Sequence, residues 1–141
     1  MNAREYLESF IQSEKKIELK INQVQKLQES LTMLSAPMDK EQVSHSRNVS
    51  VMAETVAQIV DMEKEIDQQT AVLFNRKRKV FLLLDQISSD SASLLTEHYL
   101  NAIPLSEISK ARFVSIRHIQ RKLNRALDEF QPILDQAKDV A

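Results

Sequence analysis

The sequence predicts an all-α protein, and three observations carry that prediction. Glycine is absent from all 141 residues, whereas a chain of this length ordinarily contains about ten. Hairpin-rich β folds need positive φ at many turns, which makes them improbable without glycine. Proline occurs only three times, and apolar residues recur at heptad spacing. We therefore expect a long N-terminal coiled-coil-like helical hairpin, followed by a C-terminal domain of short helices.

The first expected helix covers residues 2–35. Asn2 and Glu5 have capping-box spacing, and Met1 and Tyr6 are spaced to form the accompanying hydrophobic staple. An apolar row then repeats every seven residues, through Phe10, Ile17, Val24 and Leu31. Residues 36–50 interrupt the pattern with Pro37, a charged run and four Ser or Asn residues, so we expect a linker there.

The heptad returns in a second expected helix at 51–88, with the row Met52, Ile59, Ile66, Leu73, Val80 and Ile87. Val60, Phe74 and Phe81 are expected to widen this stripe on one side. A row sustained over six repeats is typical of coiled-coil packing. It fits an antiparallel hairpin within one chain and a rod that forms a homodimer equally well, and a hairpin that pairs with a second hairpin satisfies both.

The cluster Ser88-Ser89-Asp90-Ser91 is rich in helix-capping residues, so we place a boundary there between domains 1–88 and 89–141. Beyond it we expect a helix at 91–102 and another from Pro104 to about Ala111. A third helix begins after an N-cap at Ser115, with an apolar stripe that includes Ile119, Leu123 and Leu127. Pro132 is expected to end or kink that helix.

Several function classes are disfavoured by composition. Cysteine is absent, and the longest apolar run, Val80 to Leu84, is far shorter than the roughly 20 residues of a membrane span. No signal peptide is visible, so we expect a soluble cytoplasmic protein without a membrane partner. His45, His98 and His118 lack the i, i+3 or i+4 spacing of helical metal pairs. We expect no enzyme, no metal and no cofactor.

The distribution of charge is more informative than the net charge of −1. Residues 103–125 hold six basic side chains and one acidic side chain, a local charge of +5. Arg117, Arg121 and Arg125 repeat every four residues, so they share one helix face opposite the apolar stripe. A short helix, a three-residue turn and a helix with such a basic row are the parts of a DNA-reading helix-turn-helix. The alternative is a solvated basic face.

A second basic run, Arg76-Lys77-Arg78-Lys79, spreads around its helix and so forms no single docking face. We expect these residues to be solvated or to pair with acids of the first helix. Contact with phosphates is the alternative if the rod lies near DNA.

The C-terminal part contains Ile103 to Lys110, which read Ile-Pro-Leu-Ser-Glu-Ile-Ser-Lys, then Val114-Ser115, and then Ile119 through Arg125-Ala126-Leu127. In these segments it resembles region four of bacterial sigma factors. Two positions depart from that pattern. Phe113 stands where the motif favours glycine, and Arg112 stands where an apolar residue is common.

The whole chain is also similar to a family of phage and prophage proteins from Gram-positive bacteria, grouped with ArpU- and RinA-like transcriptional regulators. The similarity includes the opening Met1-Asn-Ala-Arg-Glu-Tyr-Leu-Glu, Ala36-Pro37, a segment from Met52-Ala53 to Ile59-Val60-Asp61, and Arg125-Ala126-Leu127.

These resemblances imply a transcriptional regulator that binds double-stranded DNA, with dimerisation or contact with host RNA polymerase assigned to the coiled coil. The implied DNA-binding residues are Lys110, Arg112, Ser115, Arg117, His118, Arg121, Lys122 and Arg125. A rival hypothesis is a protein-interaction module that binds host polymerase or another protein and never contacts DNA.

Overall fold

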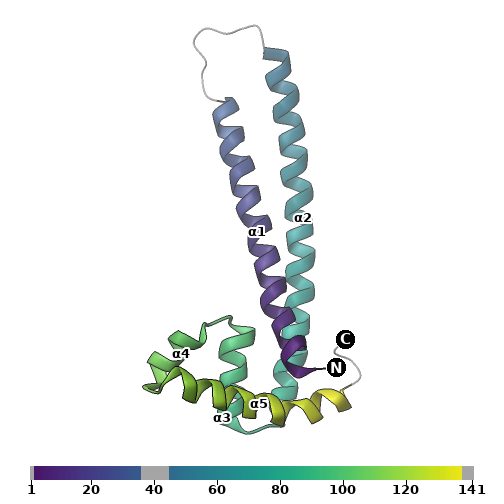
Figure 1. Ribbon diagram of the computed structural model, residues 1–141. Coiled ribbons are helices and arrows are strands. Elements are labelled where there is room, and N and C mark those ends of the chain that lie inside the picture. Colours follow the sequence, from purple (N-terminus) through teal and green to yellow (C-terminus); the bar gives the residue numbers. More distant parts are fainter. Residues whose placement is uncertain (1, 36–44, 138–141) are drawn as a thin grey trace. The chain divides into compact units, whose positions relative to one another are not determined.

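The computed structural model describes residues 2–35 and 45–137. These residues form helices throughout and include no strand, which confirms the all-α prediction for this part of the chain. The elements are α1 (Ala3–Ser35), α2 (His45–Leu84), α3 (Ser89–Leu95), the π-helix η1 (Thr96–Leu100), α4 (Leu105–Arg112) and α5 (Ile116–Gln136), and Figure 1 labels the five α-helices. Among the described helices, none is long and apolar enough to cross a membrane.

The chain divides into two compact units, and both α1 and α2 pass from one unit into the other. One unit contains Met1–Glu14 and Val72–Ala141, and the second contains Lys15–Ala71. Contacts in the first unit cross the boundary expected near 88–91. The backbone N–H of Ala3 donates to Oε1 of Gln131 at 2.7 Å, and Nζ of Lys77 donates to the carbonyl of Leu100 at 2.8 Å. The division into domains 1–88 and 89–141 stays a prediction.

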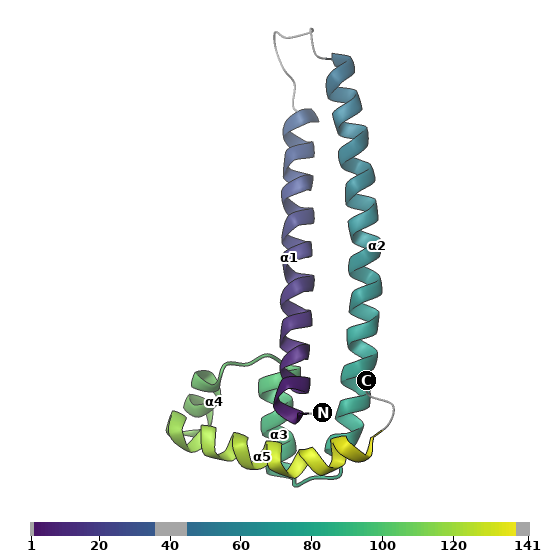
Figure 2. The same cartoon turned by 45° about the vertical axis from the view of Figure 1, so that its right-hand side comes forward.

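In the unit formed by residues 15–71, α1 and α2 lie side by side (Figures 1 and 2). Ile17, Val24 and Ile59, all members of the expected heptad rows, are buried there. Nζ of Lys20 on α1 lies 2.6 Å from a carboxylate oxygen of Glu65 on α2. Burial of apolar side chains therefore joins the two helices, and an exposed ion pair adds little to it.

The other unit has a core of aromatic and aliphatic side chains. These come from α1, α2, α3, η1, α4 and α5. The N-terminal cap is as expected, since the Glu5 N–H donates to Oδ1 of Asn2 at 3.2 Å, while Met1 lies outside the described residues. Side chains with almost no exposure include Leu7, Phe10, Val80, Leu84, Leu94, Leu95, Tyr99, Ile119, Phe130 and Leu134. α5 packs against α3 and α4.

The bounds of α2 differ from the expected 51–88. The helix already includes His45 to Ser50, which the sequence predicts as linker, because no glycine or proline interrupts that polar stretch. The rest of the expected linker, 36–44, lies outside the described residues. α2 ends at Leu84, and the next three N–H groups bond to carbonyls three positions back, at 3.1–3.3 Å. This tightened turn excludes Ile87 from the heptad row.

The prediction that Val60, Phe74 and Phe81 widen the buried stripe is wrong, because these side chains do not belong to the core. Phe74 and Phe81 are 66% and 54% exposed, and Val60 is 44% exposed. They lie to one side of the buried row instead of within it. About half of each side chain therefore remains open to solvent in the described part of the chain.

The helix expected at 91–102 is two elements. α3 ends at Leu95, and the following turn, η1, is a π-helix whose last bond joins the Asn101 N–H to the Thr96 carbonyl at 2.9 Å. In an α-helix, residues five apart diverge by about 140°, whereas i→i+5 bonding brings them close to one face. With the π turn, Tyr99 is buried in the same core as Leu94, five positions earlier. Leu100 is likewise buried together with Leu95.

The last two helices agree with expectation except at Pro132. α4 covers Leu105–Arg112, within one residue of the predicted span. Of the two outcomes expected at Pro132, an end is wrong, since α5 continues to Gln136, and a kink stays a prediction. Phe130 and Leu134, on either side of the proline, are both buried, so packing offsets the backbone hydrogen bond that proline cannot donate.

Candidate nucleic-acid interface

A tight turn joins α4 to α5. Phe113 has φ 57° and ψ 41°, the left-handed conformation that ordinarily favours glycine. The Phe113 N–H bonds to the Lys110 carbonyl at 3.3 Å, and the Val114 N–H bonds to the Ser109 carbonyl at 3.1 Å. This pair of bonds is the Schellman arrangement that satisfies the last carbonyls of a helix. The chain therefore uses the turn geometry of a glycine at Phe113, whose side chain is 95% exposed.

Ser115 caps the N-terminus of α5, as the sequence predicts. Its Oγ accepts a hydrogen bond from the backbone N–H of His118 at 3.1 Å. Ser115, Ile116, Arg117 and His118 are all exposed around this first turn. The positive end of the helix dipole and the remaining free N–H groups lie at the same place, which favours anions there.

The predicted basic row lies on the exposed face of α5. Arg117, Arg121 and Arg125 are exposed, whereas Ile119, Leu123 and Leu127 on the opposite side are buried. None of the three arginines forms an ion pair with another described residue. Lys110, on α4, is likewise exposed and forms no such pair. These four side chains leave their charge available to a partner.

Arg112 and Lys122 differ from that row because both bond to acids of the preceding elements. Arg112 lies 2.6 Å from Glu97 and 3.4 Å from Asp90, and it also donates to Oγ of Ser93 at 3.2 Å. Nζ of Lys122 lies 3.3 Å from the second oxygen of Asp90. Two of the eight predicted site residues thus belong to an ion-pair cluster that ties α4 and α5 to α3 and η1.

The second basic run is partly internal. Lys77 forms an ion pair with Glu14 of α1, as one of the expected alternatives states. The guanidinium of Arg76 lies 4.7 Å from the ring centre of Phe10 and 5.7 Å from that of Tyr6, and it donates to Oγ of Ser9 at 3.1 Å. The sequence does not predict these cation–π contacts, because the aromatic partners lie more than sixty positions away.

Three described groups, Tyr6, Tyr99 and Glu129, have shifted pKa values. Burial raises the pKa of Tyr6 and of Tyr99 above the ordinary phenol value. Hydrogen bonds from Ser91 and Ser88 lower the pKa of Glu129. Among the described residues, no three His, Asp or Glu side chains are grouped so that they could hold a metal ion.

Comparisons of the chain with protein-family models, with curated proteins and with solved structures found no match.

Proposed function

We propose that the chain is a phage-type transcriptional regulator that binds double-stranded DNA. In this proposal α4 and α5 act as a helix-turn-helix, and α5 enters the major groove with its capped N-terminus first. The long helices α1 and α2 provide dimerisation or a contact with host RNA polymerase.

One observation carries the proposal: the exposed arginine row of α5, which forms no ion pair with the described residues, follows directly after the tight turn from α4. Arginines without a protein partner keep their full capacity for phosphate or base contacts. Arg117 and Arg121, nearest the helix start, are the candidates for base contact, and Arg125 is the candidate for phosphate contact. In this proposal Lys110, Ser115 and His118 add contacts to the DNA backbone. Arg112 and Lys122 act mainly within the ion-pair cluster.

A salt series on random and phage-promoter duplexes tests this function. Each phosphate contact contributes about 0.9 to the slope of log affinity against log salt concentration. We expect the variant Arg117→Ala/Arg121→Ala/Arg125→Ala to bind weakly and with a reduced slope. A matched control removes three positive charges elsewhere, from the exposed residues Lys15, Lys16 and Lys26 of α1. Failure of the wild type to bind any duplex at low salt would refute DNA binding.

A second candidate function has one observation in its favour. Phe113 is 95% exposed and Ile116 is 47% exposed at the same turn. Exposed apolar side chains of this kind can serve as anchors in the interface with a protein partner. A protein-interaction module of this kind would bind host RNA polymerase through apolar contacts. Binding of purified polymerase that is lost in Phe113→Ser/Ile116→Ser, but kept in the triple arginine variant, would favour this candidate over DNA binding.

A further inference from the structure

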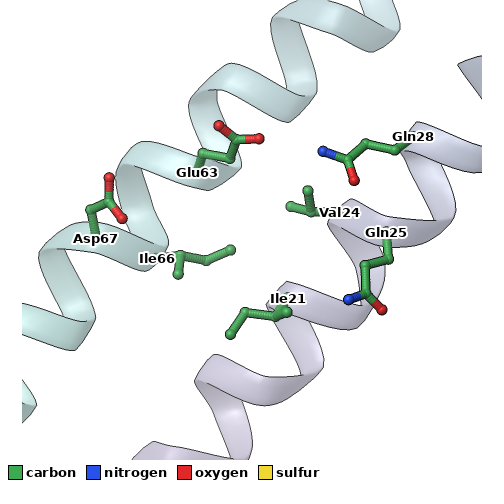
Figure 3. A pocket seen from close by; sticks show the side chains of 7 residues that line it. All are labelled: Ile21, Val24, Gln25, Gln28, Glu63, Ile66 and Asp67. Carbon is green, nitrogen blue, oxygen red and sulfur yellow. The ribbon is translucent and has the colours of Figure 1, made fainter.

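A groove with an acidic rim lies between α1 and α2 in the unit formed by residues 15–71. Its volume is about 350 Å³, and Figure 3 shows Ile66 of α2 pointing toward Ile21 and Val24 of α1. Val24 is buried, but Ile21 remains 40% exposed. Glu63 and Asp67 line the groove on its α2 side, and Gln25 and Gln28 line it on its α1 side. The groove therefore combines an apolar floor with negative charge.

The two acids of this groove lack compensation. Glu63 and Asp67 are exposed, and neither forms an ion pair with another described residue. Glu65, one helical face away, differs because Lys20 neutralises it at 2.6 Å. A partner for the groove should accordingly bring a cation together with apolar side chains.

The chain itself carries such a surface, which we call the aromatic-basic face. It lies in the other compact unit and consists of Phe74, Arg78, Phe81 and Leu82 of α2. Their i, i+4, i+7 and i+8 spacing puts them on one side of the helix. The two phenylalanines and Leu82, which is 60% exposed, are uncovered, although Leu73 and Val80 beside them are buried. Arg78 is exposed and has no ion-pair partner among the described residues.

We propose that the aromatic-basic face of one copy docks in the acid-rimmed groove of a second copy, and that this contact holds a homodimer together. An amphipathic helix face that enters a two-helix groove through i, i+4 and i+7 anchors is a recurring mode of recognition. Lengths agree: Phe74 and Phe81 are seven positions apart, as are Ile21 and Gln28, about 10 Å of helix in each case. Arg78, between the two rings, then lies opposite Glu63 and Asp67.

The arrangement is self-complementary. Each chain then contributes one face and one groove, as a two-fold symmetric interface requires. The proposal locates the self-association that is one of the arrangements the heptad row fits, and it does not rest on DNA binding.

Charge reversal with mixing tests the proposal on the full-length chain. We expect the wild type to sediment as a dimer at tens of micromolar, and both Glu63→Arg/Asp67→Arg and Arg78→Glu to weaken the dimer at least about tenfold, because like charges then meet. An equimolar mixture of the two variants should restore a dimer. In the mixed dimer the reversed face of one chain meets the reversed groove of the other, and the second contact is that of the wild type. Phe74→Ser/Phe81→Ser should lose the dimer without rescue. The reversal Glu18→Arg/Glu29→Arg, at exposed positions of α1 outside the groove, is the control.

All these positions are exposed, so far-ultraviolet circular dichroism should show each variant helical. A monomeric wild type, variants that dimerise as well as the wild type, or a mixture that stays monomeric would each overturn the proposal. The measurement contains no DNA, so its failure leaves the DNA-binding proposal to its own salt series.

Discussion

A guanidinium nitrogen of Arg112, the last residue of α4, lies 2.6 Å from a carboxylate oxygen of Glu97 in η1. The same group reaches Asp90 and Ser93 of α3. In the sequence Arg112 directly precedes the turn, and it is one of the residues predicted to bind DNA. In the structure its side chain joins three consecutive elements, α3, η1 and α4, through these contacts.

Arg112→Ala should therefore act on stability. Asp90 and Glu97 are partly exposed, so solvent screening limits the loss in the free energy of unfolding to about 1 kcal/mol. Urea denaturation followed by circular dichroism measures this change. Arg125→Ala is the control, because Arg125 is exposed and forms no described ion pair, and it should leave stability unaltered. Equal stability of wild type and Arg112→Ala, together with weakened DNA binding, would return Arg112 to the DNA interface.

Phe113→Gly should raise stability. A residue with a β-carbon in the left-handed conformation costs roughly 1–2 kcal/mol, and glycine avoids that cost but gains freedom in the unfolded chain. The ring is 95% exposed, so its removal sacrifices little packing. We expect a net gain of about 1 kcal/mol in thermal or urea unfolding. Phe113→Ala keeps the unfavourable φ and should show no such gain, and a destabilised glycine variant would mean that the ring packs in solution.

Glu129 of α5 should make stability depend on acid pH. Ser91 donates to its carboxylate, and the Ser88 hydroxyl and N–H also donate, at 3.2 and 3.3 Å. These bonds, that from Ser91 first, lower the pKa of Glu129 below its ordinary 4.5. Because the folded pKa is the lower one, the contribution is complete above the unfolded value and disappears as pH falls through the folded value.

Thermal unfolding of wild type and Glu129→Gln measures this effect. The wild type should be the more stable protein near neutral pH, and the difference should shrink as the pH falls below the ordinary 4.5 and through the lowered pKa of Glu129. Asp128→Asn, which removes an exposed neighbouring carboxylate, is the charge-matched control. A gap between wild type and Glu129→Gln that is constant with pH would contradict the role of this carboxylate.

The sequence predicts the features that depend on local pattern and misses those that depend on distant partners. Absence of glycine, heptad spacing and the Ser115 cap predict helices and most of their starts, because these are set within a few residues. The π turn after Leu95 and the continuation of α5 through Pro132 depend on burial of Tyr99 and Leu134 in a core built from remote segments. The basic row of α5 is visible from its four-residue repeat. The pairing of Lys122 with Asp90, 32 positions earlier, has no such signal.

Arg121 and Lys122 offer the sharpest test of how the basic face works, because they are adjacent and each removal costs one positive charge. Arg121 is exposed without an ion pair among the described residues, whereas Nζ of Lys122 lies 3.3 Å from Asp90. If the unpaired row binds DNA, Arg121→Ala should lower the salt slope by about 0.9 or erode discrimination between duplexes by roughly 1–3 kcal/mol. Lys122→Ala should leave both quantities close to wild type and reduce stability slightly instead. Fluorescence anisotropy across a salt series separates the two variants. Equal losses of DNA affinity would show that total charge, and not the geometry of the row, governs binding.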